Sequence, residues 1–371
     1  MSFVDYRLLD QKIGEIANSS QLNILFFINP QNLEEQRELF FKELKDGNEY
    51  NPIFRYPSKN PLYSYFSMKP TFETYKNELK ELLSNLGTDS LGILCENKVL
   101  DLIEGLELAK SVGTPNFSEN SKQFFGAVDK KLLNDAKAVL NAPEKKVDLK
   151  KVSFDEAINI IKNFFKKNKL NYTIELRESS ISTFSINPLQ KVLYINKKIS
   201  FDENMVKRLI AHEIETHAYR YENGLLQPYS ILAQGTSKLY LETDEGLAVN
   251  IEKLKNLHID SQLRTYAGRV LAIDYASKKS FYETFSKLRE HFSDDESFNL
   301  TLRAKRGTFK TSEPGAFTKD ILYFKGMSLV EDFLKDHPLE SLYYGRYSTD
   351  EYSLVRGVEG LKKPFYMPKF S

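Results

Sequence analysis

The sequence of 371 residues contains one cysteine, no tryptophan and almost equal numbers of positive and negative charges. The single cysteine, Cys95, excludes a framework of intrachain disulfides, and the apolar run at residues 91–95 predicts that it lies in the core. A net charge of +1 and a pI near 7.7 leave no basic field that would attract nucleic acid or a membrane surface. We therefore expect neither nucleic acid nor a membrane as a partner.

Long hydrophobic segments are also missing. The first residues include Asp5, Arg7 and Asp10 instead of the apolar stretch of a signal peptide, and the apolar residues 22–28 are far too few to span a bilayer. From these absences we expect a cytoplasmic protein, and its length allows a large core.

Histidine is scarce, and its distribution is the most informative feature of the chain. Two of the five histidines, His212 and His217, flank Glu213 within the hexapeptide HEIETH, an HExxxH pattern. Two neutral imidazoles can hold a Zn²⁺ ion, and the carboxylate between them can take a proton from the water on that ion. The hexapeptide therefore predicts zinc-assisted hydrolysis, with two ordinary helix histidines as the alternative.

The spacing of the two histidines has a geometric consequence. On a regular helix, residues five apart differ by about 140° and residues four apart by about 40°, so the imidazoles of an HExxxH pattern would diverge. A single widened turn, the π-bulge common at functional sites, brings them back together. We therefore predict a local π-bulge between His212 and His217.

The helix that carries the hexapeptide has its own signals. Ser200 and Glu203 form the pattern of a capping box, which predicts Ser200 as the N-cap. Apolar residues then recur at helical spacing: Val206, Leu209, Ile210, Ile214 and Ala218. This face is expected to pack on a core.

A zinc site that catalyses hydrolysis needs a third protein ligand and an open fourth position. Glu245 begins an apolar stretch that continues to Leu254, so we expect it near the start of a second helix. Glu242 and Asp244 compete for the same role, and an exposed first-turn glutamate favoured by the helix dipole is the alternative. The apolar run after Glu245 makes it the preferred third ligand.

These motifs resemble those of the microtubule-associated tyrosine carboxypeptidases, a family whose bacterial relatives are called QEGLA-motif proteins. The resemblance rests on HEIETH, on residues 223–228 and on the DEGLA stretch at residues 244–248. It extends to residues 51–56 near the start of the chain, to residues 306–326, and to residues 360–368 near its end.

The resemblance implies a zinc-dependent carboxypeptidase with one Zn²⁺ per chain. It implies that His212, His217 and Glu245 bind the metal and that Glu213 is the catalytic base. Asp244 occupies the position at which many relatives have glutamine, so the chain reads DEGLA and not QEGLA. This difference concerns a residue that would contact a metal ligand, and the ligand itself is the same. The residue removed from the substrate would be aromatic, tyrosine or phenylalanine.

The matching C-terminal segment supplies candidates for contact with the substrate. Tyr323 is predicted to donate to the oxyanion, with a tyrosine of the apolar core as the alternative. A carboxypeptidase must also bind the terminal carboxylate, for which a paired cation is suited. Arg306 is the first choice and Lys319 the second, with Arg303 close by; a surface charge or a structural ion pair is the alternative for each.

The predicted partner is the C-terminus of a peptide or protein. Tubulin is not expected, because the sequence shows no long basic extension that would fit the acidic surface of a microtubule.

Two other functions stay open. One is a zinc aminopeptidase that resembles dipeptidyl peptidase III, although the third ligand of that family lies in an EExxxE-like helix much farther along its chain. The other is a non-catalytic regulatory protein with structural zinc. Such a site more often uses four protein ligands, and Cys95, His258, His291 and His337 show no ligand spacing. Glu213, which structural zinc would not require, also counts against that function.

The predicted fold class is α+β: a mostly helical, zincin-like metallopeptidase with a small sheet beside the HExxxH helix. A charged connector at residues 145–151 is the best candidate for a domain boundary. It would separate an N-terminal mainly helical region, residues 1–147, from a catalytic domain, residues 148–371.

Periodicity places the elements within these two parts. Helices are expected at residues 6–17, 33–44, 72–86 and 122–140 of the first part, interrupted by residues 48–61 and 113–121. The second part is expected to contain a helix at residues 154–167, strands at 170–177 and 191–196, the zinc helix, and further helices to about residue 335.

Overall fold

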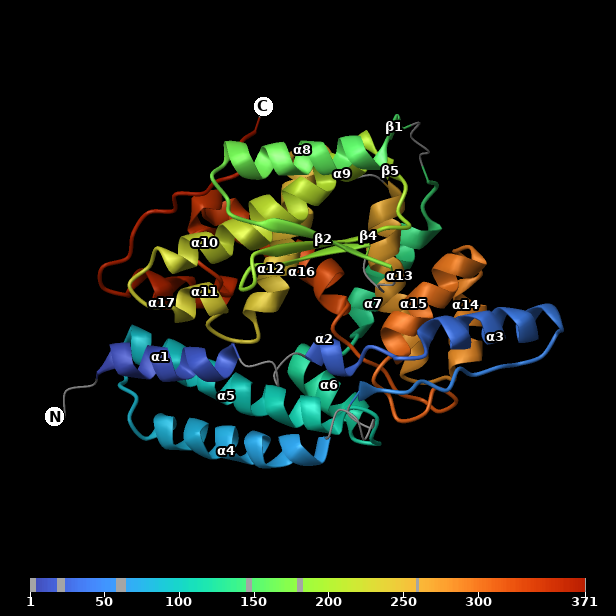
Figure 1. The fold of residues 1–371 in the computed structure, drawn as a ribbon, viewed down its shortest axis with the longest axis horizontal. Coiled ribbons are helices and arrows are strands. Elements are labelled where there is room, and N and C mark those ends of the chain that lie inside the picture. The colour runs from blue at the N-terminus through green and yellow to red at the C-terminus, as the bar shows by residue number, and fades with distance from the viewer. Residues whose placement is uncertain are drawn as a thin grey trace.

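The part of the chain that the structure describes is mostly helical with two small sheets, as the α+β prediction requires, whereas its zincin-like character stays a prediction. The structure is a computed structural model, and it describes residues 5–18, 24–57, 65–144, 149–178, 183–257 and 260–370. In Figure 1 the N-terminal helices α1, α4 and α5 form a layer on one side, and α8 lies on the opposite side, with the three-stranded sheet between them. Within the described ranges, no helix has the length and apolar character needed to cross a membrane.

The described residues of the first part of the chain form seven helices. They are α1 (Tyr6–Ala17), α2 (Ile24–Phe27), α3 (Leu33–Lys45), α4 (Tyr65–Leu83), α5 (Ser90–Ser111), α6 (Phe117–Phe125) and α7 (Lys130–Asn141). The helix predicted at residues 122–140 is wrong as a single element, because Gly126 has a φ of 91° and separates α6 from α7. Helix α5 was not predicted, and Cys95 lies fully buried within it, as expected.

The middle of the chain carries the strands and the hexapeptide. Its elements are β1 (Lys151–Val152), α8 (Phe154–Lys167), β2 (Thr173–Arg177), β3 (Phe184–Asn187), β4 (Val192–Asn196), β5 (Phe201–Asp202), α9 (Glu203–Leu209), a π-helix (Ile210–Ala218), α10 (Tyr219–Leu225), α11 (Ile231–Gln234) and α12 (Tyr240–Leu254). The remaining elements are α13 (Asp260–Ala276), α14 (Phe281–Leu288), α15 (Asp294–Lys305), α16 (Ile321–Asp336), the 3₁₀ helices η5 (Leu339–Leu342) and η6 (Thr349–Glu351), and α17 (Tyr352–Arg356).

The three-stranded sheet has the order β2-β4-β3. Strand β4 is parallel to β2 and antiparallel to β3, so β3 forms one edge of the sheet. Both predicted strands are confirmed as β2 and β4, but β3 was missed because its four residues are too few to show an alternating pattern. This missed strand is the one that lies against the π-helix.

The helix of the hexapeptide begins later than predicted. Asp202 is its N-cap, and the Asp202 carboxylate accepts a hydrogen bond of 2.8 Å from the Met205 N–H. The predicted capping box at Ser200 is wrong because residues 201–202 pair with β1 as the short strand β5, which keeps the backbone extended up to the cap. Helix α9, the π-helix and α10 then follow without a break.

Helices α12 and α16 cross in close backbone contact at Gly246 and Gly326. A Cβ atom on Gly246 would overlap the Gly326 carbonyl, and one on Gly326 would overlap the Glu242 carbonyl. Glycine is needed at both positions because only its missing side chain allows two helix backbones to approach this closely. The crossing fixes Glu245, the neighbour of Gly246, relative to helix α16.

One hydrophobic core joins the two predicted parts of the chain. Its members include Ile13 and Leu94 from the first part and Leu232, Ile273 and Phe317 from the second. A second core lies between α8, the sheet and the π-helix. The boundary predicted between residues 147 and 148 falls outside the described residues and stays a prediction.

Candidate active site

The widened turn brings the two histidines of the hexapeptide together. Residues 210–218 form a π-helix, and the ring centroids of His212 and His217 lie 5.1 Å apart. This is the local geometry that the five-residue spacing predicts. The Thr216 hydroxyl donates a hydrogen bond of 2.9 Å to the Ala211 carbonyl, which helps to satisfy the backbone of the widened turn.

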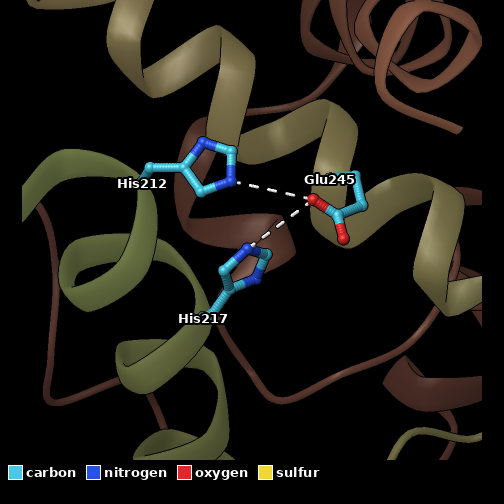
Figure 2. Close-up of side chains that lie close together, drawn as sticks. All are labelled: His212, His217 and Glu245. Carbon is cyan, nitrogen blue, oxygen red and sulfur yellow. Dashed lines mark ion pairs between the residues drawn. The ribbon is translucent and has the colours of Figure 1, made fainter. Parts of the chain in front are cut away.

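Helix α12 supplies a carboxylate that faces both histidines. Oε2 of Glu245 lies 3.7 Å from Nε2 of His212 and 3.8 Å from Nε2 of His217, as Figure 2 shows. One ligand atom from each of the three residues can be chosen so that all lie within 4.8 Å of one another. These three residues could hold a metal ion.

The two oxygens of Glu245 have different surroundings. Oε1 accepts a hydrogen bond of 3.2 Å from the Lys319 ammonium group. Oε2 is buried and has no hydrogen-bond partner among the described residues. A buried acceptor without a partner needs an explanation, and a cation bound between it and the two imidazoles would supply one.

The competing carboxylates near Glu245 have other partners. Glu242 accepts a hydrogen bond of 2.7 Å from Lys325. Asp244 bonds to Nδ1 of His217 at 2.8 Å, not to the ring nitrogen that faces Glu245. Of the three acidic residues at this end of α12, only Glu245 directs an oxygen to both Nε2 atoms.

Each histidine contacts a carboxylate through the ring nitrogen that faces away from Glu245. Nδ1 of His212 lies 2.7 Å from Oε1 of Glu252, and Nδ1 of His217 lies 2.8 Å from Oδ2 of Asp244. A carboxylate at Nδ1 favours the tautomer that leaves the lone pair of Nε2 free and makes it more basic. Sequence reasoning did not identify Glu252, although it lies seven residues after Glu245 and hence on the same face of α12.

Asp244 is itself held by two arginines. Arg220 donates to its Oδ1 at 2.7 Å and Arg346 to its Oδ2 at 3.0 Å. Burial alone would raise the pKa of Asp244, but Arg346, His217 and Arg220 lower it well below its usual value. The aspartate of DEGLA is therefore a fixed, ionised partner of His217.

The site favours a positive charge at its centre. Burial alone would lower the pKa of His212, but the nearby carboxylates of Glu245 and Glu252 raise it to about 10. Burial alone would raise the pKa of Glu245, but Lys319 and the two histidines lower it. Such a surplus of carboxylates around two imidazoles attracts a cation.

Glu213 is held by the edge strand of the sheet. The Ile186 N–H in β3 donates a hydrogen bond of 2.9 Å to Oε2 of Glu213. Burial raises the pKa of Glu213, and His212 and His217 oppose this rise. A carboxylate with a raised pKa beside a candidate metal site has the properties of a general base.

A cavity of about 470 Å³ opens in front of His212 and Glu213. Its walls come from the start of β3 and the residue before it, from α9, from one face of α13, from Phe292 and one face of α15, and from α16. Phe184, Tyr266 and Leu300 contribute apolar or aromatic surface. This volume lies within the usual range for small-molecule sites, about 300–1,000 Å³.

Tyr323, the predicted oxyanion donor, lines this cavity. Its ring stacks on the ring of His212, with centroids 6.3 Å apart and planes 18° apart. It also stacks on Tyr266, with centroids 5.4 Å apart. Burial raises the pKa of Tyr323, so its hydroxyl stays protonated and able to donate.

The two cations predicted to bind the substrate carboxylate lie in different places. Lys319 pairs with the third candidate ligand, Glu245, at 3.2 Å. Arg306 is buried, lies over the Phe317 ring at 5.4 Å, and is not among the residues that line the cavity. Helix α15 presents residues 296, 299, 300 and 303 to the cavity and ends at Lys305. Arg306 follows the end of the helix and therefore does not continue the face that lines the cavity.

Comparison with known proteins gives a consistent result. A family model described as microtubule-associated tyrosine carboxypeptidase matches residues 38–370. The chain is 24% identical to mouse microtubule-associated tyrosine carboxypeptidase 1 over 322 residues, which cover 85% of this chain and 58% of that protein. It is 30% identical to human MATCAP2, named as a candidate tyrosine carboxypeptidase, over 176 residues, which cover 44% of this chain and 33% of that protein. The chain therefore spans less than two thirds of the length of these relatives.

Proposed function

We propose a carboxypeptidase function for this chain, which belongs to the family of microtubule-associated tyrosine carboxypeptidases. In the proposed reaction, a zinc ion held by His212, His217 and Glu245 and a base, Glu213, remove one residue from the C-terminus of a peptide or protein. The residue removed is aromatic, tyrosine or phenylalanine. Family membership supports the class of reaction, and the geometry of the site supports the roles of the residues.

The observation that carries the proposal is the buried, unpartnered oxygen Oε2 of Glu245. It lies 3.7 Å and 3.8 Å from the Nε2 atoms of His212 and His217. Zinc bonds of about 2.0–2.2 Å in tetrahedral geometry require ligand atoms about 3.4 Å apart, so each of these two distances would have to shorten by about 0.4 Å or less. Zinc bound there would lower the pKa of a water molecule to about 7 and polarise the scissile carbonyl.

Glu213 moves the proton in the proposed mechanism. The Ile186 N–H fixes one of its carboxylate oxygens and leaves the other for the attacking water. Its raised pKa makes it a stronger base than an exposed glutamate. Glu213 accepts the proton of the water and then delivers it to the amine that leaves.

Tyr323 stabilises the negative charge that develops on the carbonyl oxygen. Its ring stacks on His212, and it lines the cavity in front of Glu213. A protonated hydroxyl held by stacked rings donates to the oxyanion without reorganising during the reaction.

The cavity wall supports an aromatic residue at the substrate's C-terminus. Phe184, Tyr266, Phe292 and Leu300 contribute aromatic and apolar surface to a wall that also carries polar residues. Aromatic rings bury a large area and pair favourably when their edges or faces are offset, which suits the ring of tyrosine or phenylalanine. The names of the relatives, which specify tyrosine, agree with this choice.

The experiment that tests the proposal is peptide truncation read by mass spectrometry. The zinc-loaded protein is incubated with a peptide that ends in tyrosine and with an isomer in which tyrosine lies one position before the end. We expect loss of a single tyrosine from the first peptide, no loss from the second, and very slow loss with Glu213→Gln.

Other outcomes of this experiment support the alternatives. Release of an N-terminal dipeptide would indicate an aminopeptidase related to dipeptidyl peptidase III. An intact peptide under all conditions would indicate a non-catalytic protein. The expectation that tubulin is not the substrate stays a prediction, which the same assay tests when tubulin replaces the peptide.

A further inference from the structure

The wall of the cavity opposite the hexapeptide carries more positive than negative charge. Arg269 of α13 and Arg303 of α15 line the cavity, and Arg306 lies behind them. Burial alone would raise the pKa of the Asp320 carboxyl group, but these three guanidinium groups lower it. Two carboxylates, Asp320 and Glu296, face these three cations, and Glu296 already accepts hydrogen bonds from Ser293. The wall therefore keeps a net positive charge that can attract an anion.

The cations around the site differ in what they already bind. Arg303 donates to both oxygens of Asp320, one of them at 3.0 Å. Lys319 bonds to Glu245 at 3.2 Å, and Arg208 lies 3.8 Å from Glu252. These three cations therefore already form ion pairs with carboxylates of the protein.

Arg269 differs from these three cations, because two nitrogens of its guanidinium group have no hydrogen-bond partner among the described residues. Arg306 has one such nitrogen, Nε, but does not line the cavity. The Nε and Nη1 atoms of Arg269 are buried and unpaired among the described residues, although the side chain lines the cavity. Buried N–H groups in native proteins almost always have a partner, and a buried donor that lacks one on the wall of a cavity indicates a missing ligand. The planar guanidinium group matches the geometry of a carboxylate.

The position of Arg269 suits the end of a short substrate. The guanidinium carbon lies 4.2 Å from the centre of the Tyr323 ring and 5.2 Å from that of Tyr266. The Tyr323 ring in turn stacks on His212. Tyr323 thus contacts both Arg269 and the candidate metal ligand His212, and all three residues line the same cavity.

We propose that Arg269 binds the terminal α-carboxylate of the substrate and so limits cleavage to the last residue. The proposal rests on the proposed carboxypeptidase function and replaces Arg306 and Lys319 as the residues that recognise the carboxylate. In the protein without substrate, cation–π contacts with the rings of Tyr266 and Tyr323 hold the guanidinium group in place.

Binding, measured separately from turnover, tests this role. The zinc-loaded Glu213→Gln protein serves as the non-cleaving parent, and isothermal calorimetry gives its Kd for a peptide that ends in tyrosine and for the same peptide with a C-terminal amide. A hydrogen bond to a charged group corresponds to roughly a ten- to hundredfold change in Kd. We expect the parent to bind the free acid tighter than the amide by about this factor.

Adding Arg269→Met to the parent should remove that preference. The free acid should then bind as weakly as the amide, and the affinity for the amide should stay the same. Arg289→Met is the matched control, because Arg289 is half-exposed and pairs with Asp294 away from the cavity. It should leave the preference intact.

A thermal unfolding curve separates recognition from a structural role. Because Arg269 has unpaired buried donors in the free protein, Arg269→Met should melt at the same or a higher temperature than its parent. Arg269→Lys, which keeps the charge but loses the planar array of donors, should retain only part of the preference for the free acid.

The outcomes distinguish this inference from the proposed function. A protein that removes C-terminal tyrosine while Arg269→Met keeps the full preference for the free acid would overturn the role of Arg269 and leave the carboxypeptidase intact. A protein that cleaves nothing but loses its preference for the free acid on Arg269→Met would overturn the function and support the carboxylate site. Equal binding of acid and amide by the parent would overturn the site.

Discussion

At the scale of single residues, the chemistry of the site depends on carboxylates that the hexapeptide alone does not reveal. The spacing of the hexapeptide predicted His212 and His217 as neighbours, and the apolar run after Glu245 and the family resemblance predicted it as the third ligand. The structure brings the three side chains together. Glu252 was not predicted as the partner of His212, because no motif marks it and the two residues meet only when the π-helix packs against α12. The contact between Glu213 and the backbone of β3 was not predicted either, because it forms only when β3 packs against the π-helix.

The carboxylates at the Nδ1 atoms should control metal affinity. Replacing Glu252 with glutamine, or Asp244 with asparagine, keeps the shape of the side chain but removes the charge that orients and polarises the imidazole. Loss of such a contact typically weakens metal binding about 10- to 100-fold. Competition titration with a chromophoric chelator measures this affinity. Glu222→Gln, a glutamate of α10 that pairs with Lys191, is the control and should bind zinc as the wild type does.

Glu213 should be required for turnover but not for metal binding. Glu213→Gln keeps a hydrogen-bond acceptor for the Ile186 N–H but removes the base, so kcat should fall about 10²–10⁴-fold with zinc content unchanged. Glu215→Gln in the same hexapeptide is the control, because Glu215 pairs with Lys255 at 2.6 Å and does not line the cavity. Wild-type rates in Glu213→Gln would assign the proton transfer to another residue.

At the scale of elements, periodicity predicted most helices and missed those without a polar face. Helices α1 and α8 have the predicted bounds because each has one apolar stripe that faces a core. Helix α5 is buried on most of its surface, so its apolar residues show no stripe and it was overlooked. The π-helix could be predicted because the chemistry required both imidazoles on one side.

The close crossing of α12 and α16 should be essential for the position of Glu245. In Gly246→Ala, the added methyl group would overlap the Gly326 carbonyl, and neither backbone can yield without moving its helix. We expect a loss of about 3 kcal/mol in the free energy of unfolding, at the upper end of the usual cost of overpacking, together with weaker zinc binding. Denaturant titration measures the stability. Ser261→Ala, at an exposed position of α13, is the control and should change stability little.

At the scale of the whole molecule, the first and second parts of the chain share one hydrophobic core. Leu94 of α5 and Ile273 of α13 both belong to it, and helix α7 packs on α13. The sequence predicted the two parts from a charged connector, but composition cannot show which apolar faces will pack together. A shared core couples the N-terminal helices to the elements that hold the site.

This coupling should appear as one cooperative unfolding transition that depends on metal. Calorimetry of the zinc-loaded protein should show a single transition, because two parts that share one hydrophobic core unfold together. Zinc that binds the folded state alone stabilises it by about 4 kcal/mol at a free concentration 1,000 times its Kd, so a chelator should lower the Tm. Two separate transitions, with a chelator shifting only one of them, would show that the two parts fold independently.

The central claim is that the side chains of His212, His217 and Glu245 together hold one zinc ion. Elemental analysis of the purified wild-type protein and of Glu245→Gln tests it most directly, with Glu242→Gln as the matched control from the same helix. Glu242 pairs with Lys325 and not with the histidines, so its variant should keep its metal. We predict one zinc per chain in the wild type and in Glu242→Gln and a large loss in Glu245→Gln. A full equivalent of zinc in Glu245→Gln, or its loss in Glu242→Gln, would contradict the account.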